Sequence, residues 1–481
     1  MTKKSKHSPN IIVLFADQLR PFELGCHGHP VVKTPNIDRL ASLGVRFDVA
    51  CTSNPVCTPA RSTLISGQYG RTCIGMLGCC GNPSDRRGKF PDTTLPELLS
   101  IGYDGYETFA CGKWHIEPNP LRLGFEHAFY PLVNHLNVGQ TYFDGTGKAR
   151  VVEGYCPDTE VETSCDFIRK PHQRPFFLYH NMALPHMPFF DVPQRYLEKY
   201  SPEQAVLRPN VFREGQLWYD EHAMKVYWTN WLYMEKVDPK YDVLPEGFDL
   251  RKMTALYYGM ITAVDDQVGA ILDCLEETGQ LENTVILLTS DHGENLGSHW
   301  LWNKISVNDE AVRIPFIIAW PGTLKPQVVT RHVASLVDVA PTLLSLASRP
   351  VPAHLQGRDL SPILRGEIGT IEDGGAIIEN LFGEIAIRTP DHLFSIMTRS
   401  RPEGPQREVV DEESLFFDLR NDPYQLHNLA GDGFQTDVVD ALRRRVLDWD
   451  KQTPWMHTSD GGLYAQGGKH DFPSRSKRCF G

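Results

Sequence analysis

Four short, continuous apolar runs mark the strands that the sequence predicts. They are IIVLF (residues 11–15), FFLYHNM (176–182), TVILLTS (284–290) and PFIIAW (315–320). Runs of this kind are typical of strands that are buried on both faces, as in a parallel sheet, whereas a half-exposed strand alternates apolar and polar residues.

Helical patterns lie between these runs. Residues 34–44, TPNIDRLASLG, begin with Thr-Pro and end with Gly, which favour the start and the stop of a helix. A second pattern ends at Thr278-Gly279, and its apolar residues share one face: Met260, Ile261, Val264, Val268, Ile271, Leu272 and Leu275. Strands joined by helices at this spacing predict an α/β fold with a mostly parallel sheet that is flanked by helices.

The pattern changes after Leu343. Residues 368–375 are rich in turn formers, and the segments EIAIRTP, HLFSIM and SLFFDL then resemble antiparallel strands, followed by a helix near residues 438–449. We therefore predict two units. An α/β domain spans residues 1–372, and a smaller α+β domain with a short antiparallel sheet and an irregular tail spans residues 373–481.

Composition and charge narrow the function. The 481 residues are 41% hydrophobic and 22% charged, which is ordinary for a soluble globular protein. The formal net charge of -12 argues against a nucleic-acid partner. The first apolar run is too short for a signal sequence, and no run reaches the roughly 18 apolar residues of a membrane span. We expect a cytoplasmic protein with no membrane partner, and a homo-oligomer is possible. We expect its cysteines to be mostly buried, reduced thiols.

Polar residues follow two of the predicted strands. Asp17 and Gln18 come directly after the first strand, and Asp291 and His292 come directly after TVILLTS. Ligands of open α/β sheets bind beyond the carboxyl ends of the strands. Two carboxylates, an amide oxygen and an imidazole could bind one divalent cation there, Ca²⁺ foremost, with Mg²⁺ or Mn²⁺ as alternatives. Otherwise Asp17 caps a turn and His292 is an ordinary loop histidine.

The stretch PVCTPARSTLISG (residues 55–67) raises a question about the thiol of Cys57. Pro59 suits the first turn of a helix, and a helix N-terminus attracts anions. The phosphatase-type spacing C-x5-R is absent, because the arginine is Arg61 and residue 63 is a threonine. A cysteine hydrolase with a histidine base and a buried structural cysteine both stay open on these residues alone.

Cys57-Thr58-Pro59-Ala60-Arg61, with LISG at residues 64–67, resembles the CxPxR signature and LxxG extension of the type I sulfatase family. Further blocks similar to that family follow one another in the right order over nearly the whole chain: ADQLR (16–20), GCHGHPVVKTPNIDRLASLG (25–44), CGKWHI (111–116), LPHMP (184–188), SDHGENLGSHWLWNK (290–304), RIPFIIAWPG (313–322) and SLFFDLRNDPYQLHNLA (414–430). This resemblance implies an alkaline-phosphatase-like fold and the hydrolysis of a small-molecule or saccharide sulfate ester.

The resemblance also implies how Cys57 is used. In that family a dedicated formylglycine-generating enzyme oxidises the cysteine to Cα-formylglycine, an aldehyde. The hydrated aldehyde carries two hydroxyls. One attacks the sulfur, and the other re-forms the aldehyde and releases sulfate. By the same likeness the metal ligands are Asp17, Gln18, Cys57, Asp291 and His292.

Five further residues receive roles from the family's pattern. Arg61 would contact the hydrated aldehyde, and Lys113 would contact the sulfuryl oxygens. His115 would act as the base that regenerates the aldehyde, His186 would lie at the leaving oxygen, and Lys304 would supply a second cation.

Two pairs depart from the commonest family pattern. Many members have two aspartates where this chain has Asp17-Gln18, and Asp-Asn where it has Asp291-His292. The Asp-Gln and Asp-His combination occurs in several branches of the sulfatase family and in the phosphonate monoester hydrolases, so hydrolysis of a phosphonate monoester or phosphodiester is the first alternative. The others are a non-catalytic scaffold that binds sulfated ligands and a cysteine hydrolase or redox protein. Asn82 and the aromatic residues within 218–233 could also line the site, or the aromatic residues could form a buried helical stripe.

Overall fold

The computed structural model describes residues 8–75, 90–131, 135–213, 216–217, 250–372, 374–400, 407–431 and 436–456. Asn82, the aromatic residues within 218–233 and the C-terminal tail, which the sequence analysis considered, lie outside the described residues.

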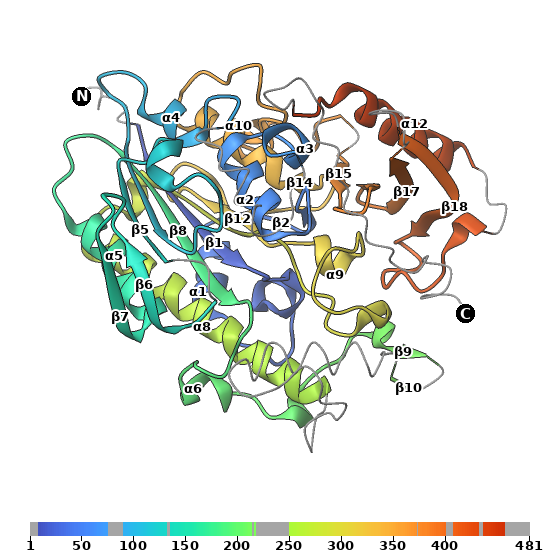
Figure 1. Cartoon of the computed structure of the whole chain (residues 1–481), viewed down its shortest axis with the longest axis horizontal. Coiled ribbons are helices and arrows are strands. Elements are labelled where there is room, and N and C mark those ends of the chain that lie inside the picture. The colour runs from blue at the N-terminus through green and yellow to red at the C-terminus, as the bar shows by residue number, and fades with distance from the viewer. Residues whose placement is uncertain are drawn as a thin grey trace.

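A ten-stranded sheet forms the centre of the larger part of the molecule (Figure 1), in the order β13–β2–β12–β11–β1–β8–β4–β5–β6–β7. Its strands are β1 (Asn10–Asp17), β2 (Gly44–Phe47), β4 (Glu107–Gly112), β5 (His127–Pro131), β6 (Val138–Phe143), β7 (Ala149–Tyr155), β8 (Phe176–Pro185), β11 (Thr284–Ser290), β12 (Phe316–Ala319) and β13 (Gln327–Val329). The four predicted strands are all present, as β1, β8, β11 and β12.

The sheet contains both parallel and antiparallel pairs of strands. β1 runs parallel to both of its neighbours, β8 and β11, and β4 runs parallel to β8 and β5. β12 runs antiparallel to β11 and β2, and β6 is antiparallel to β5 and β7. An apolar run indicates that a strand is buried on both faces, and it carries no information on direction. The expectation of a mostly parallel sheet is confirmed.

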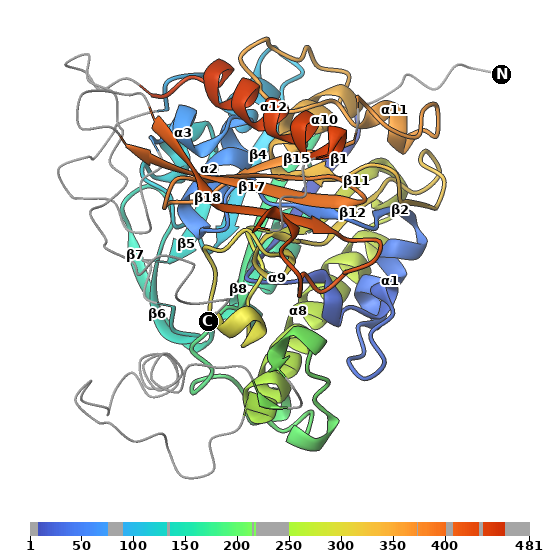
Figure 2. The ribbon, with the colours of Figure 1, turned by 90° about the vertical axis from the view of Figure 1, so that its right-hand side faces the viewer.

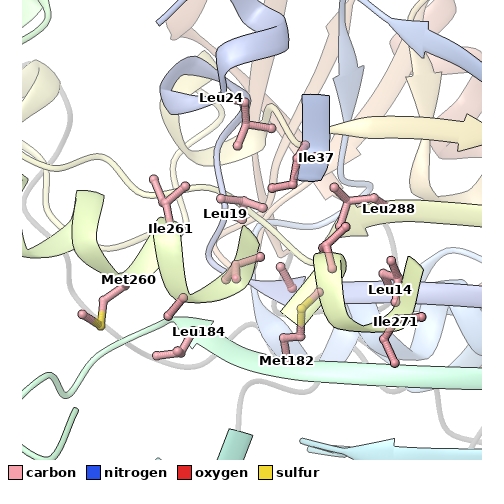
Figure 3. Close-up of a cluster of buried hydrophobic side chains, with 14 of the residues drawn as sticks. Leu14, Leu19, Leu24, Ile37, Met182, Leu184, Met260, Ile261, Ile271 and Leu288 are labelled. Atoms are coloured by element: carbon pink, nitrogen blue, oxygen red, sulfur yellow. The ribbon is translucent and has the colours of Figure 1, made fainter. Parts of the chain in front are cut away.

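Helices cover both faces of the sheet. The sequence of β1 is apolar throughout because each of its faces lies in a hydrophobic core. Leu14 and its alternate neighbours belong to one core with Ile261 and Ile271 of α8, and Figure 3 shows this cluster. Val13 and its alternate neighbours belong to a second core on the other face. The helices at the first core are α1 (Pro35–Ser42), α5 (Cys156–Arg169) and α8 (Leu250–Glu277), and those at the second are α2 (Cys57–Ser66), α4 (Leu95–Ser100) and α10 (Val339–Leu346).

A four-stranded antiparallel sheet lies toward the C-terminus, with α12 (Asp437–Gln452) on one face (Figure 2). Its strands are β15 (Ala376–Glu379), β16 (Glu384–Arg388), β17 (His392–Ser400) and β18 (Arg407–Asp418). The three strands and the helix that the sequence predicted in this region are confirmed. The division of the chain at residue 372 stays a prediction.

One buried arginine connects this C-terminal region to the helices of the larger part. Arg71 lies on α3 (Gly70–Cys73), shortly after α2. Its guanidinium forms ion pairs with Glu379 and Asp450 and lies 4.4 Å and 4.5 Å from the ring centroids of Trp449 and Trp455. Charge and cation–π attraction therefore act together at this junction.

Two further sequence expectations concern thiols and membranes. No disulfide joins the eight cysteines of the described part, and seven of them are buried. Among the described helices, none combines the length and the apolar content that crossing a membrane needs.

The buried Glu160 should make the free energy of unfolding depend on pH, separately from the site described below. Its carboxyl group is buried beneath the sheet, where the Tyr142 hydroxyl donates a hydrogen bond to Oε1 at 2.6 Å. Burial raises the pKa of Glu160 from 4.5 to about 8. The folded chain therefore binds this proton more tightly than the unfolded chain. Its contribution to stability is complete below pH 4.5 and is lost as the pH rises through 8.

We expect the free energy of unfolding to fall between pH 5 and pH 9 more steeply in the wild type than in Glu160→Gln, which cannot ionise. Urea unfolding across this range measures the difference, and substitution of the exposed Glu282 to Gln provides the control. Parallel curves for the wild type and Glu160→Gln would contradict the assignment.

Candidate active site

The site lies where β1 and β11 end side by side. Ala16 pairs with Ser290, and Asp291 follows at once, with its backbone N–H donating to the carbonyl of Ala16 at 3.3 Å. Because the two strands are parallel, their carboxyl ends place Asp17 and Asp291 at the same edge of the sheet, as the sequence predicted.

Cys57 reaches this edge from the second core. α2 begins at Cys57, after Val56 in extended backbone, and it ends at Ser66, before Gly67, whose φ of 66° is the left-handed conformation that glycine favours. The Cys57 side chain is 1% exposed, and its Sγ lies 3.9 Å from Asp17 Oδ1. The helix N-terminus thus brings positive partial charge and a thiol to the carboxylates.

Four buried side chains form a donor set that could bind a metal. One ligand atom from each of Asp17, Cys57, Asp291 and His292 lies within 4.8 Å of every other. His292 Nε2 is 3.2 Å from Cys57 Sγ and 3.5 Å from Asp291 Oδ1. His292 Nδ1 lies 2.8 Å from the carbonyl of Gly293, which can only accept, so Nδ1 carries a proton and Nε2 faces the cluster.

Gln18 adds an oxygen to this set. Its backbone N–H donates to Asp291 Oδ1 at 3.0 Å, and its φ is 69°. The side-chain Nε2 donates to Glu294, and Oε1 is buried with no hydrogen-bond partner among the described residues. A buried oxygen of this kind is costly unless something binds it. The donors therefore fit a divalent cation that prefers oxygen ligands.

Arg61 lies one turn along α2 and clamps the two carboxylates. Its Nη2 is 2.9 Å from Asp17 Oδ2 and 3.0 Å from Asp291 Oδ2, and all three side chains are fully buried. Nη1 donates to the carbonyl of Lys113 and to Asn181 Oδ1. The ion pairs of Arg61 are thus with two of the candidate metal ligands, and its predicted contact with the hydrated aldehyde stays a prediction.

The two carboxylates differ in protonation behaviour. Burial and the charge of Asp17 raise the pKa of Asp291 to about 6. Burial and Cys57 also act to raise the pKa of Asp17, but Lys113 and the other nearby cations outweigh them and hold that pKa well below its usual value. Asp17 is therefore the more strongly ionised member of the pair.

Two lysines approach the cluster from different segments. Lys113 Nζ is 2.5 Å from Asp17 Oδ2, and Lys304 Nζ is 2.9 Å from Cys57 Sγ and 3.4 Å from His186 Nε2. β4 ends at Gly112, so Lys113 and His115 lie in the segment that follows this strand. His115 has a φ of 53°, and this turn keeps its ring close to Cys57.

Three histidine rings lie beside these cations. The ring of His135 stacks on that of His186 at 4.4 Å and meets that of His115 at 5.7 Å. Burial lowers the pKa of each of these histidines, and Lys113 lowers it further. Neutral imidazoles can accept or pass a proton, which is what ester cleavage needs.

The structure brings all ten sequence-predicted site residues to this edge of the sheet, and it adds three that sequence reasoning missed. Asn181 lies inside β8, whose apolar run continues past it to Met182, so the strand-end position did not identify it. His135 has no motif around it, and its Nδ1 is 3.1 Å from Lys113 Nζ. Glu294 lies within the SDHGENLG block, where no role was assigned to it.

The comparisons with known proteins agree with this geometry. Residues 9–349 match the model of the Sulfatase family. The chain is 30% identical to the ulvan-active sulfatase of Formosa agariphila, over 92% of this chain and 81% of that one. It is 27% identical to the N-acetylglucosamine-6-O-sulfatase of Bacteroides thetaiotaomicron, over 94% and 88%.

A comparison with solved structures agrees with the family match. A structure described as a sulfatase of Bacteroides fragilis superposes with a TM-score of 0.76 and 25% identity, and the match covers 94% of this chain and 97% of that one. The family match extends over well more than half of the chain, and the fold agrees over nearly all of it. The chain therefore belongs to the sulfatase family and is a hydrolase of sulfate esters.

Proposed function

We propose that this sulfatase acts on a sulfated saccharide, through a formylglycine made from Cys57 and with one bound divalent cation. The observation that carries the proposal is the convergence on Cys57 Sγ of Lys304 Nζ at 2.9 Å, His292 Nε2 at 3.2 Å and Asp17 Oδ1 at 3.9 Å. A structural cysteine has no need of an ammonium, an imidazole and a carboxylate around it. The names of the two relatives, an ulvan-active sulfatase and an N-acetylglucosamine-6-O-sulfatase, support a saccharide substrate.

Asp17, Gln18, Asp291 and His292 would bind the cation, together with residue 57. Their oxygen-rich donor set favours Ca²⁺ over Mg²⁺ and Mn²⁺. When bound, the cation lowers the pKa of an attached hydroxyl and neutralises charge on sulfate oxygens. Arg61 orients the two carboxylates, since its guanidinium contacts both.

Residue 57 supplies the nucleophile. A formylglycine there, once hydrated, offers one hydroxyl to attack sulfur and a second whose loss of a proton frees sulfate. His115 approaches residue 57 and is placed to take that proton, because burial keeps its ring neutral. Lys113 and Lys304 reach the site from two segments and balance the charge of the sulfate oxygens.

Lys304 is placed to protonate the departing alcohol oxygen, with His186 beside it. His186 Nδ1 donates to the carbonyl of Met187 at 2.5 Å, so Nε2 is the acceptor that Lys304 Nζ meets at 3.4 Å. Lys304 can give its proton to the leaving oxygen, and its interaction with His186 holds the ammonium in place.

Two measurements test this proposal. We expect an aryl sulfate and N-acetylglucosamine 6-sulfate to be hydrolysed in preference to a phosphonate monoester and a phosphate diester, as measured by initial rates. Peptide mass spectrometry over residue 57 should show an aldehyde in place of the thiol. A clear preference for the phosphonate would favour the phosphonate hydrolase alternative, and an unmodified thiol in fully active enzyme would refute the formylglycine.

Removal of the metal gives a separate prediction. EDTA followed by gel filtration is expected to abolish turnover, because the buried carboxylates then lose the cation that balances them. Added Ca²⁺ should restore more activity than Mg²⁺. Full activity of a protein shown by elemental analysis to be free of metal would contradict the metal site.

A further inference from the structure

Glu294 is not one of the proposed metal ligands, but it contacts one of them, Gln18. Glu294 follows β11 in the SDHGENLG block, and it is 1% exposed. Its two carboxylate oxygens serve different partners. Oε2 accepts a hydrogen bond from Gln18 Nε2, and Oε1 accepts from two backbone N–H groups.

The first contact fixes the orientation of the Gln18 amide. A carboxylate can only accept, so the amide must turn its NH₂ toward Glu294. Oε1 of Gln18 is then left buried with no hydrogen-bond partner among the described residues. Gln18 directly follows Asp17, and its backbone N–H donates to Asp291, so this oxygen is presented from within the ligand set.

The second contact fixes the loop that carries Lys304. Glu294 Oε1 accepts from Leu296 N at 3.0 Å and from Asn303 N at 2.6 Å. Both residues have positive φ, 45° and 62°, which non-glycine residues rarely adopt. Asn303 immediately precedes Lys304, whose Nζ lies 2.9 Å from Cys57 Sγ. One carboxylate oxygen thus joins the two ends of a strained loop.

We propose that Glu294 is a positioning residue that orients the Gln18 amide oxygen toward the cation and anchors the loop that delivers Lys304. The inference rests on the proposed metal site, and it concerns a residue that contacts neither substrate nor cation. Partners of this kind behind metal ligands typically change affinity by 10- to 100-fold when they are replaced.

A double-mutant cycle between positions 18 and 294 tests the first part, with metal-free protein titrated with Ca²⁺ and with Mg²⁺ by calorimetry. In the wild-type background Glu294→Gln puts two NH₂ groups face to face, so the Gln18 amide must turn and Ca²⁺ binding should weaken by about 10- to 100-fold. In the Gln18→Glu background the same change removes a clash of two carboxylates and supplies a donor. There Glu294→Gln should strengthen Ca²⁺ binding. This reversal of sign is the expected result.

If Glu294 had a purely structural role, Glu294→Gln would lower Ca²⁺ affinity equally with Gln18 and with Gln18→Glu. That result would overturn the inference while leaving the metal site in place. Absence of Ca²⁺ and Mg²⁺ binding by the wild type would overturn the metal site and the inference together. Glu384→Gln is the matched control. Glu384 is equally buried, accepts from Ser395 and Asn380 in the C-terminal sheet, and should leave Ca²⁺ affinity unchanged.

The loop part has its own readout. Glutamine keeps the oxygen that Leu296 and Asn303 use, whereas alanine removes it. At saturating Ca²⁺, Glu294→Ala should therefore lower kcat more than Glu294→Gln does, with KM changing less than kcat. Equal kcat values for the two variants would overturn the anchoring of the loop.

Discussion

Cys57→Ala is expected to abolish the hydrolysis of sulfate esters without unfolding the protein. The substitution removes one buried sulfur atom at the start of α2, and the apolar residues of both cores stay in place. Removal of a covalent nucleophile can cost about 10⁶-fold in kcat. Initial rates with an aryl sulfate, together with thermal unfolding, measure both effects.

Cys51→Ala is the matched control for this prediction. Cys51 is also fully buried, on β3 (Ala50–Cys51), but it packs in the core beneath the C-terminal sheet. Its substitution should change stability slightly and leave turnover at the wild-type level. Cys57→Ser adds a second comparison, because serine retains one hydroxyl and no aldehyde. Undiminished turnover in Cys57→Ala would refute the assignment of the nucleophile.

Arg61→Met is expected to be the most destabilising of the substitutions considered for this site. It would leave the carboxylates of Asp17 and Asp291 buried without their shared guanidinium. The loss of one partner from a buried ion pair costs about 3–5 kcal/mol. Burial acts to lower the pKa of Arg61, yet Asp291 and Asp17 outweigh it and raise that pKa, which shows how strongly the three charges are coupled. Urea unfolding at constant pH measures the loss.

An arginine on the surface provides the control for this estimate. Arg39 also pairs with two carboxylates, those of Asp273 and Glu276, but all three side chains are partly exposed. Exposed pairs contribute about 0–1 kcal/mol, so Arg39→Met should be close to neutral. Added Ca²⁺ should restore part of the stability of Arg61→Met, because a cation compensates the same carboxylates. Equal losses in the two variants would contradict the role of burial.

The sequence predicted most of the fold because its strongest signals are local. The apolar run of β1 and the Thr-Pro and Gly ends of α1 each depend on neighbouring residues alone. The antiparallel direction of β12 depends instead on how distant segments connect, and an apolar run has the same composition in either direction. Asp17 and Asp291 could be predicted from their positions directly after strands, because ligands of open α/β sheets bind beyond the carboxyl ends of the strands.

The part of the site that depends on tertiary contacts could not be predicted in this way. His135 reaches His186 and Lys113 from a segment without a recognisable motif. The family's pattern assigned Arg61 a contact with the hydrated aldehyde, which stays a prediction, and gave no indication of the ion pairs that Arg61 forms with two carboxylates. A side chain four residues along a helix can point to the same site as Cys57, but its partners come from β1 and β11, which only the folded sheet brings together.

The junction at Arg71 sets an order of events during synthesis. Arg71 lies fourteen positions beyond Cys57 in the numbering, yet its partners Trp449, Asp450 and Trp455 are among the last described residues. The segment after α2 therefore gains these contacts only after residues 449–455 have been synthesised. Because Cys57 is 1% exposed in the folded chain, an enzyme that modified it would need the chain to be open around residue 57.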